Sequence, residues 1–171
     1  MAGDLPQVVM YTDGGCDPNP GPGGYGVVLL FAGQRKELSG GYRLTTNNRM
    51  EIMAAIAGLR ALNRRCRVTL HTDSEYLANA MSKGWARRWR ANGWMRNKTD
   101  PALNPDLWQE LLALCEQHEV AFVWVRGHAG NAENERCDQL TRQARRNRNL
   151  PPDPGYPPAS NAGPTLFGAA Q

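Results

Sequence analysis

Long hydrophobic runs are missing from this sequence of 171 residues: no stretch of about 18 apolar residues occurs in it. Its first residues carry Asp4 and Pro6 where a secretory signal would need an apolar stretch. These absences argue against a membrane-spanning helix and against export. We therefore expect a cytoplasmic protein without membrane association.

Clustered cysteines are missing as well. The four cysteines lie far apart and never form a C-x-x-C pair, whereas a disulfide framework or a zinc ribbon spaces its cysteines closely. We therefore expect a reduced protein. A zinc site stays open as an alternative, although no pair of its candidates has the usual ligand spacing. Those candidates are Cys66, His71, Cys115, His118 and Cys137.

The composition indicates a folded protein with an affinity for polyanions. Hydrophobic residues make up 41% of the chain and charged residues 21%, which excludes a collagen-like or wholly disordered chain. Lysine plus arginine number 20 against 16 for aspartate plus glutamate, and the sequence pI is about 9.1. Such a basic balance favours a polyanionic partner. The length fits a single domain, and we expect a monomer.

The end of the chain differs from the rest. Residues 150–171 have almost no charge and no hydrophobic periodicity, so we predict a domain over 1–149 and a disordered tail over 150–171. The tripeptide Thr165-Leu166-Phe167 is a candidate for weak docking on a protein partner, with a passive solvated end as the alternative. The tail contains Pro151, Pro152, Pro154, Pro157, Pro158 and Pro164.

Alternating β-rich and helical patterns predict an α/β fold with a mixed sheet. A tight turn at 32–34 implies antiparallel pairing of its flanking strands, whereas the later strands are reached through helical crossovers. Residues 18–24 predict a loop, Asn48 and Glu51 are spaced like a capping box, and Ser74 offers an N-cap for a short helix. The predicted strands are 8–12, 26–31, 35–43, 67–72 and a buried strand 122–125; the predicted helices begin at 48, 74, 105 and 132.

Two of the predicted strands end in an aspartate, Asp13 and Asp73. If these strands are parallel neighbours, both carboxylates lie at the carboxyl edge of the sheet, where α/β proteins bind ligands. Glu51 and Asp138 would join them if their helices point the same way. Such a cluster is tolerable mainly with a bound divalent ion, and oxygen ligands favour Mg²⁺ or Mn²⁺. Ordinary turn and helix-start acids are the alternative interpretation.

Several motifs, in this order along residues 8–146, resemble the ribonuclease HI family. They are Tyr11-Thr12-Asp13-Gly14-Gly15, the Gly-rich segment 19–26, Thr45-Thr46-Asn47-Asn48-Arg49-Met50-Glu51, Thr72-Asp73-Ser74, Gly127-His128-Ala129-Gly130 and Asn134-Glu135-Arg136-Cys137-Asp138. The resemblance implies a five-stranded mixed sheet flanked by helices, with strands 1–3 antiparallel and strands 4–5 parallel alongside strand 1. It also implies endonucleolytic hydrolysis of RNA paired with DNA.

The resemblance also assigns the chemistry. It implies that Asp13, Glu51, Asp73 and Asp138 hold two Mg²⁺ ions, with Mn²⁺ as a substitute, and that His128 is a mobile catalytic histidine. The expected mechanism is two-metal hydrolysis that leaves a 5′-phosphate and a 3′-hydroxyl. A surface loop histidine is the alternative for His128.

A basic and aromatic segment without acidic residues follows Glu75 and resembles the family's basic protrusion, which grips the DNA strand. Burial of its tryptophans in the core is the alternative. The residues that we assign to it are Lys83, Trp85, Arg87, Arg88, Trp89 and Arg90.

By resemblance, backbone near Cys16 together with Asn19, Glu51 and Glu75 would line the path of the RNA 2′-hydroxyls, which distinguish RNA from DNA. Thr46 and Asn47 would hold a DNA phosphate.

Three positions depart from the bacterial pattern. Leu44 stands where relatives often carry arginine, and Arg43, one place earlier, points to the other face of a strand, so it is an uncertain substitute. Glu75 stands where glutamine is common and adds a negative charge, and Gly15 replaces a common serine. We expect a weaker phosphate pocket.

Two other functions remain open at this stage. A catalytically silent module could bind hybrids or duplex RNA through the basic segment alone. An integrase or resolvase could carry similar carboxylates on a similar sheet, because a fold does not determine a function. The Gly-rich segment and the Gly-His-Ala-Gly segment favour the ribonuclease.

Overall fold

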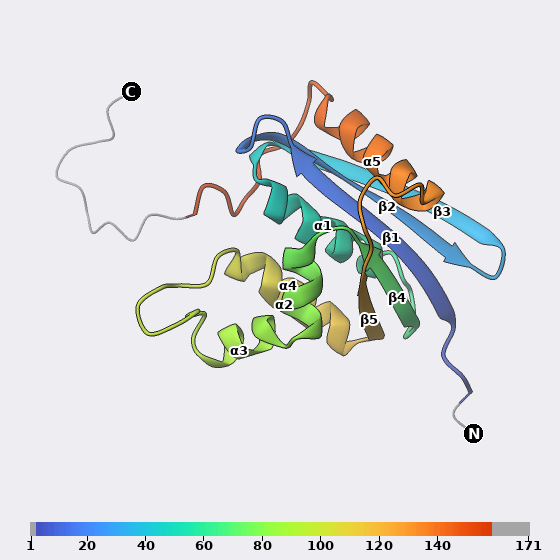
Figure 1. Ribbon diagram of the computed structural model, residues 1–171, viewed down its shortest axis with the longest axis horizontal. Coiled ribbons are helices and arrows are strands. Elements are labelled where there is room, and N and C mark those ends of the chain that lie inside the picture. The colour runs from blue at the N-terminus through green and yellow to red at the C-terminus, as the bar shows by residue number, and fades with distance from the viewer. Residues whose placement is uncertain (1–2, 159–171) are drawn as a thin grey trace.

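The computed structural model describes residues 3–158, which form one five-stranded sheet with the strand order β3-β2-β1-β4-β5 (Figure 1). β1 pairs antiparallel with β2, β2 pairs antiparallel with β3, and β4 and β5 run parallel to β1. This confirms the predicted mixed sheet. The strands are β1 (Gln7–Cys16), β2 (Gly21–Phe31), β3 (Gln34–Thr45), β4 (Arg67–Thr72) and β5 (Glu119–Trp124).

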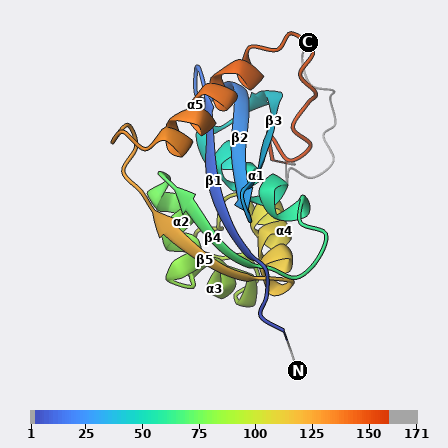
Figure 2. The same cartoon turned by 90° about the vertical axis from the view of Figure 1, so that its right-hand side faces the viewer.

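The helices cover the two faces of the sheet unequally. α1 packs on one face over a large apolar core that includes Met10, Leu70 and Trp108, and α5 crosses the opposite face over a smaller cluster around Val28 (Figure 2). None of the helices within residues 3–158 has the length and apolar character that crossing a membrane requires. The helices are α1 (Asn47–Arg60), α2 (Glu75–Ser82), α3 (Trp85–Ala91), α4 (Pro105–Glu116) and α5 (Ala132–Arg145).

The start of α1 differs from the predicted capping box. Thr46 is the N-cap, and its hydroxyl accepts a hydrogen bond from the Arg49 amide at 3.2 Å. Asn48 is already helical, so the predicted box of Asn48 and Glu51 is wrong. A threonine hydroxyl is among the groups that cap helices, and the structure places the cap two residues earlier than predicted. The predicted cap of α2 is confirmed, because Ser74 accepts from the Leu77 amide.

β1 and β2 are longer than predicted. Their pairing continues through Gly15 opposite Gly24 and Cys16 opposite Gly23, so part of the predicted loop 18–24 is strand. A Cβ at Gly14 would collide with the Met50 carbonyl of α1. A Cβ at Gly24, within the predicted loop, would collide with the Thr141 carbonyl of α5. Both glycines therefore let a helix approach the sheet closely.

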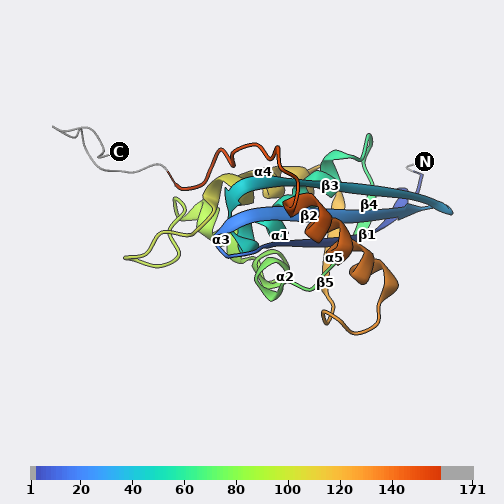
Figure 3. The same ribbon diagram turned by 90° about the horizontal axis from the view of Figure 1, so that it is seen from above.

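β5 is an edge strand and not the buried strand that its apolar residues predicted. Val123 is 37% exposed and Trp124 is 47% exposed. The apolar run predicts a strand correctly, but whether a further strand covers its open edge depends on the topology. α3, in the basic and aromatic segment, was not predicted; it lies at the end of the molecule opposite the N terminus (Figure 3).

The packed chain extends past the boundary predicted at residue 149. Asp153 is buried, accepts from the Thr45 hydroxyl and forms an ion pair with the buried Arg49, with both distances at 2.7 Å. The Pro151 carbonyl accepts from the Arg43 amide at 3.0 Å. We name residues 150–158 the C-terminal strap. The predicted docking tripeptide 165–167 lies outside the described residues.

We predict that Asp153→Asn lowers the free energy of unfolding by about 2 kcal/mol, because it removes a charge-assisted hydrogen bond and leaves the buried Arg49 with the half-exposed Asp106 as its ion-pair partner. Urea unfolding at pH 7 measures this loss. Arg49 holds the pKa of Asp153 below its ordinary value of 3.8. The difference in free energy of unfolding between the parent and Asp153→Asn should therefore vanish as the pH falls below 3.8 and Asp153 becomes protonated.

Two truncations provide the control for this prediction. A chain that ends at residue 158 keeps the strap and should unfold like the full chain. A chain that ends at residue 149 lacks Asp153 and should lose at least as much stability as Asp153→Asn. Equal stability of the two truncated chains would contradict the role of the strap.

Candidate active site

The carboxyl ends of β1 and β4 bring two aspartates together. Thr12 of β1 is in parallel register with Thr72 of β4, so Asp13 and Asp73 follow side by side. Glu51 reaches them from α1, which presses against Gly14. One oxygen from each of the three carboxylates lies within 4.8 Å of the others. Asp13, Glu51 and Asp73 therefore form one compact cluster, as the sequence suggested.

The three carboxylates destabilise one another's charge. Burial, followed by the charges of Asp73 and Asp138, raises the pKa of Asp13 to about 7. Burial and the charges of Asp13 and Asp73 raise the pKa of Glu51 well above its ordinary value, and burial raises that of Asp73. The Glu51 Oε2 atom is buried and has no hydrogen-bond partner. A divalent cation would satisfy this oxygen and offset the repulsion, so these residues fit a hard metal ion.

Asp138 approaches the cluster from α5, on the opposite side of the sheet from Glu51. Its carboxylate is paired with Arg142, one turn further along α5, at 2.6 Å. Its charge nevertheless contributes to the raised pKa of Asp13. The structure thus brings three of the four predicted carboxylates into one cluster and places the fourth beside it.

The four carboxylates open into a common cleft of about 420 Å³, which we name the carboxylate cleft. It also receives His128 from the loop after β5. His128 is exposed, has a φ of 56°, and its charge lowers the pKa of Asp73. The cleft is lined by Asp13, Gly14, Gly15, Asn47, Asn48, Glu51, Asp73, Ser74, Glu75, Tyr76, His128, Asp138, Thr141 and Arg145.

The sequence as a whole matches a known family: the RNase H profile covers residues 6–146. A ribonuclease H of Syntrophus aciditrophicus is 67% identical over 151 residues, which is 88% of this chain and 87% of the relative. A ribonuclease HI of Synechocystis is 57% identical over 157 residues, which is 91% of this chain and 98% of the relative. The chain belongs to the RNase H family.

Solved RNase H structures share the fold. LC9-RNase H1, described as a type 1 RNase H with the type 2 active-site motif, has a TM-score of 0.74 and 34% identity, covering 84% of this chain and 74% of that one. LC11-RNase H1, solved in complex with an RNA/DNA hybrid, has a TM-score of 0.62 and 26% identity, covering 80% of this chain and 95% of that one. The family match sets aside the integrase and resolvase alternative.

The zinc alternative finds no support in the geometry. Within residues 3–158, the cluster of potential ligands is the carboxylate one, Asp13, Glu51 and Asp73. His118 lies beside Cys66, but its Nδ1 atom accepts a hydrogen bond from the Cys66 amide at 3.1 Å. This pair is part of the core packing.

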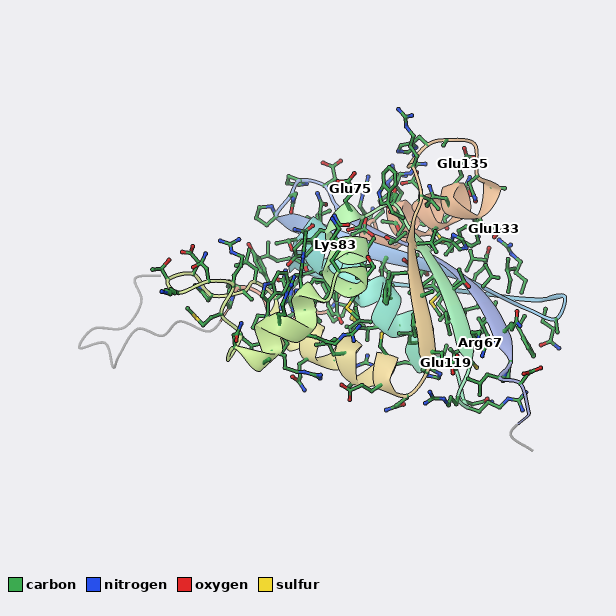
Figure 4. All side chains as sticks on the ribbon, turned by 60° about the horizontal axis from the view of Figure 1, so that its bottom comes forward. Arg67, Glu75, Lys83, Glu119, Glu133 and Glu135 are labelled. Carbon is green, nitrogen blue, oxygen red and sulfur yellow. The ribbon has the colours of Figure 1, made fainter. Side chains whose placement is uncertain are left out.

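The residues predicted to meet the RNA strand are tied to the start of α1. The Cys16 amide donates to Asn47 Oδ1 at 2.6 Å, and the Asn47 amide donates to Asn19 Oδ1 at 3.1 Å. These bonds fix the β1–β2 loop against the start of α1, the helix that carries Glu51. Glu75 begins α2 at the carboxylate cleft, whereas Lys83 caps the far end of this helix (Figure 4).

A second hollow of about 620 Å³ lies beside the carboxylate cleft, and we name it the α1 hollow. Thr46 and Asn47, predicted to hold a DNA phosphate, line it together with Asn104, which sequence reasoning missed. In the sequence, Asn104 is accounted for by its place before Pro105 at the start of a helix. Its positive φ of 58° is visible only in the structure. The hollow is lined by Asn19, Pro20, Thr46, Asn47, Asn48, Arg49, Leu103, Asn104, Pro105, Asp106, Gly155, Tyr156 and Pro158.

Arg43 does not line the α1 hollow. Its side chain is exposed near the end of β3, and its amide is bonded to the C-terminal strap. Leu44 is 44% exposed. The departure noted in the sequence at Leu44 is therefore not compensated within the hollow.

The basic and aromatic segment contains α3 and its flanks. Trp89 packs edge-on against the buried Trp108 with ring centroids 5.9 Å apart, and Trp85 is partly buried against the same core under the Lys83 ammonium. The alternative of core packing is thus confirmed for both tryptophans. Charges of the segment remain on the surface.

The three central arginines of the basic and aromatic segment differ in exposure and in ion pairing. Arg87 and Arg88 are exposed, whereas Arg90 forms an ion pair with Glu116 at 2.9 Å. Arg87 and Arg88 are therefore the side chains best placed for a polyanion.

We predict that the metal-free protein loses stability as the pH rises from 3.8 to about 7. In this range the folded protein keeps a proton on Asp13 that the unfolded chain releases, so unfolding becomes more favourable with rising pH. Asp13→Asn removes this charge and should raise the metal-free free energy of unfolding at pH 8 by about 2 kcal/mol. Thermal melting in EDTA measures both effects.

Addition of Mg²⁺ should raise the melting temperature of the parent protein and have little effect on Asp13→Asn, because a ligand that binds only the folded state stabilises it. Asp4→Asn removes a charge from an exposed site and serves as the control. Equal Mg²⁺ shifts for the parent and for Asp13→Asn would argue against a metal site at the cluster.

Proposed function

We propose that the protein is an endoribonuclease that hydrolyses the RNA strand of RNA–DNA hybrids with two Mg²⁺ ions, for which Mn²⁺ can substitute. The convergence of Asp13, Glu51 and Asp73 in an open cleft of an RNase H chain is the observation that carries the proposal. The hybrid bound to the related LC11-RNase H1 supports the choice of substrate. We keep the monomeric state and the cytoplasmic setting as predictions from the sequence.

The carboxylates act as ligands and not as bases in this proposal. Asp13 clusters with Glu51 and Asp73, and the charge of Asp138 also acts on it, so Asp13 would be the carboxylate that the two ions share. When bound, divalent ions lower the pKa of a water and offset negative charge on a departing oxygen, here the 3′-oxygen of the RNA. The products would carry a 5′-phosphate and a 3′-hydroxyl.

His128 is proposed to move a proton at the cleft. Its imidazole is exposed and stands between Gly127 and Gly130, and its charge is close enough to Asp73 to lower the pKa of that carboxyl. An imidazole can both donate and accept a proton, so His128 is proposed to move one as the product leaves. The glycines on either side allow the loop to adjust.

The two strands of the hybrid would use different surfaces. The Cys16 backbone, Asn19, Glu51 and Glu75 are proposed to face the RNA 2′-hydroxyls. Glu51 and Glu75 line the carboxylate cleft, and Cys16 and Asn19 are hydrogen-bonded to Asn47, which also lines it. The α1 hollow, with Thr46, Asn47 and Asn104, is proposed to hold a DNA phosphate. The basic segment is proposed to grip the DNA strand further along.

We predict that Asp13→Asn abolishes cleavage while hybrid binding stays within about twofold, because it removes a metal ligand and no contact surface. The assay incubates labelled RNA–DNA hybrid, duplex RNA and duplex DNA with and without Mg²⁺. The parent should cleave only the RNA of the hybrid, and only with metal. Asp4→Asn should cleave like the parent.

The same assay separates the silent binding module from the enzyme. A silent module would bind the hybrid without cutting it under any metal condition. Turnover of Asp13→Asn at the parent rate would refute the assignment of Asp13.

We predict that Arg87→Gln/Arg88→Gln reduces the slope of log binding constant against log salt by about two, because each neutralised phosphate releases counterions. Filter binding of a non-cleaved hybrid at several salt concentrations measures this slope. Arg64→Gln/Arg65→Gln removes the same charge from an exposed loop between α1 and β4 and is the matched control. Equal slopes for both double variants would contradict the role of α3.

A further inference from the structure

Arg145 is the charged residue of the carboxylate cleft to which the roles above give no task. It is the last residue of α5 and lines the cleft together with Asp138 and Thr141. Residues three and four positions apart are neighbours on a helix surface, so these three side chains share one face of α5. The helix that presents the fourth carboxylate therefore presents a cation to the same opening.

The Arg145 side chain is enclosed but weakly paired. It is 21% exposed, whereas the side chain of Arg142 is 48% exposed and is bound to Asp138 at 2.6 Å. The ion pair of Arg145 with Asp17 spans 3.9 Å, and Asp17 is itself 76% exposed. No hydrogen bond to the Arg145 guanidinium is present within residues 3–158. Its N–H donors are therefore available to a ligand.

The surroundings place Arg145 between the carboxylates and the path proposed for RNA. Burial raises the pKa of the Cys16 thiol to about 11, and the positive charge of Arg145 is one of the influences that oppose this rise. Arg145 also reaches Asp17, the residue that follows Cys16, whose backbone is proposed to meet the RNA. Thr46 and Asn104, proposed for the DNA strand, line the α1 hollow and not the carboxylate cleft, whereas Asn47 lines both.

We propose that Arg145 binds a phosphate of the RNA strand next to the phosphate that is cleaved. This inference rests on the proposed function. A guanidinium binds phosphate through two parallel N–H bonds, which gives position as well as affinity. A cation at the border of a cleft with four carboxylates also offsets their repulsion of a polyanion. Arg145 is thus a substrate-positioning residue beside the metal ligands.

The test measures hybrid binding by the full chain with Asp13→Asn, so that the hybrid stays intact. Adding Arg145→Gln should weaken binding about fivefold to tenfold at about 0.1 M salt and reduce the salt slope by about one. Arg145→Lys should keep the slope and lose part of the affinity, because lysine is a point charge. Arg146→Gln removes the same charge from an exposed neighbour outside the cleft and should change neither value.

The strand is identified with hybrids that carry one neutral methylphosphonate. Placed in the RNA strand beside the scissile phosphate, it should erase the difference between Arg145→Gln and its parent. Placed in the DNA strand, it should leave the difference intact. In the chain that keeps Asp13, Arg145→Gln should raise the KM for cleavage of the hybrid and leave kcat unchanged.

Three outcomes would overturn the inference. One is equal affinity and salt slope for Arg145→Gln and its parent. Another is an equal loss in Arg146→Gln, which would reveal only the general charge of α5. The third is a loss of kcat together with a changed Mg²⁺ effect on the melting temperature and an unchanged affinity for the hybrid. This result would show that Arg145 only positions the carboxylates. If the parent itself fails to bind hybrid, the proposed function fails instead.

Discussion

The crowding of buried carboxylates at one edge of the sheet is the constraint around which the structure is arranged. The parallel register of β1 and β4 places Asp13 beside Asp73, and the contact of α1 with Gly14 brings Glu51 to both. Burial raises the pKa values of all three groups, and repulsion from neighbouring carboxylates, Asp138 included, adds to the rise. Such an arrangement opposes folding unless a cation binds, so the rest of the molecule must hold it in place.

The apolar core and the C-terminal strap share this task. α1 packs its apolar residues on the sheet, and Arg49, two residues before Glu51, is held by Asp153 of the strap and by Asp106 at the start of α4. The strap also binds Thr45, next to the cap of α1. Segments far apart in the chain thus fix the beginning of the helix that carries Glu51, and the same contacts shape the α1 hollow.

Around the cleft, some side chains pack into the core or pair with one another, and others leave their charge available on the surface. In the basic segment, Trp89 and Trp85 join the core, while Arg87 and Arg88 stay exposed. On α5, Arg142 is occupied by Asp138, while Arg145 remains weakly paired inside the cleft. The direction of each side chain, more than its charge, decides whether it supports the structure or meets a polyanion.

Local spacing allowed much of the fold to be predicted. The α/β order and the cap at Ser74 depend on neighbouring residues and are confirmed. Asp73 directly follows β4 as predicted, whereas β1 continues past Asp13 to Cys16. The gathering of Asp13, Glu51 and Asp73 followed once the strands were taken as parallel neighbours. The family motifs supplied the activity, which periodicity and spacing alone do not contain.

Other features depended on contacts between segments distant in sequence. The glycines of β1 and β2 predict a loop from the sequence, but in the structure they are strand residues against which helices pack. The apolar residues of β5 predict a buried strand, but the sheet ends at β5 and leaves it exposed. From the sequence, Asp153 belongs to a proline-rich tail, whereas in the structure it forms an ion pair with Arg49. Sequence by itself determined which groups can carry the chemistry; tertiary structure alone decided which of them meet, because burial and pairing are properties of the assembled layers and not of any single segment.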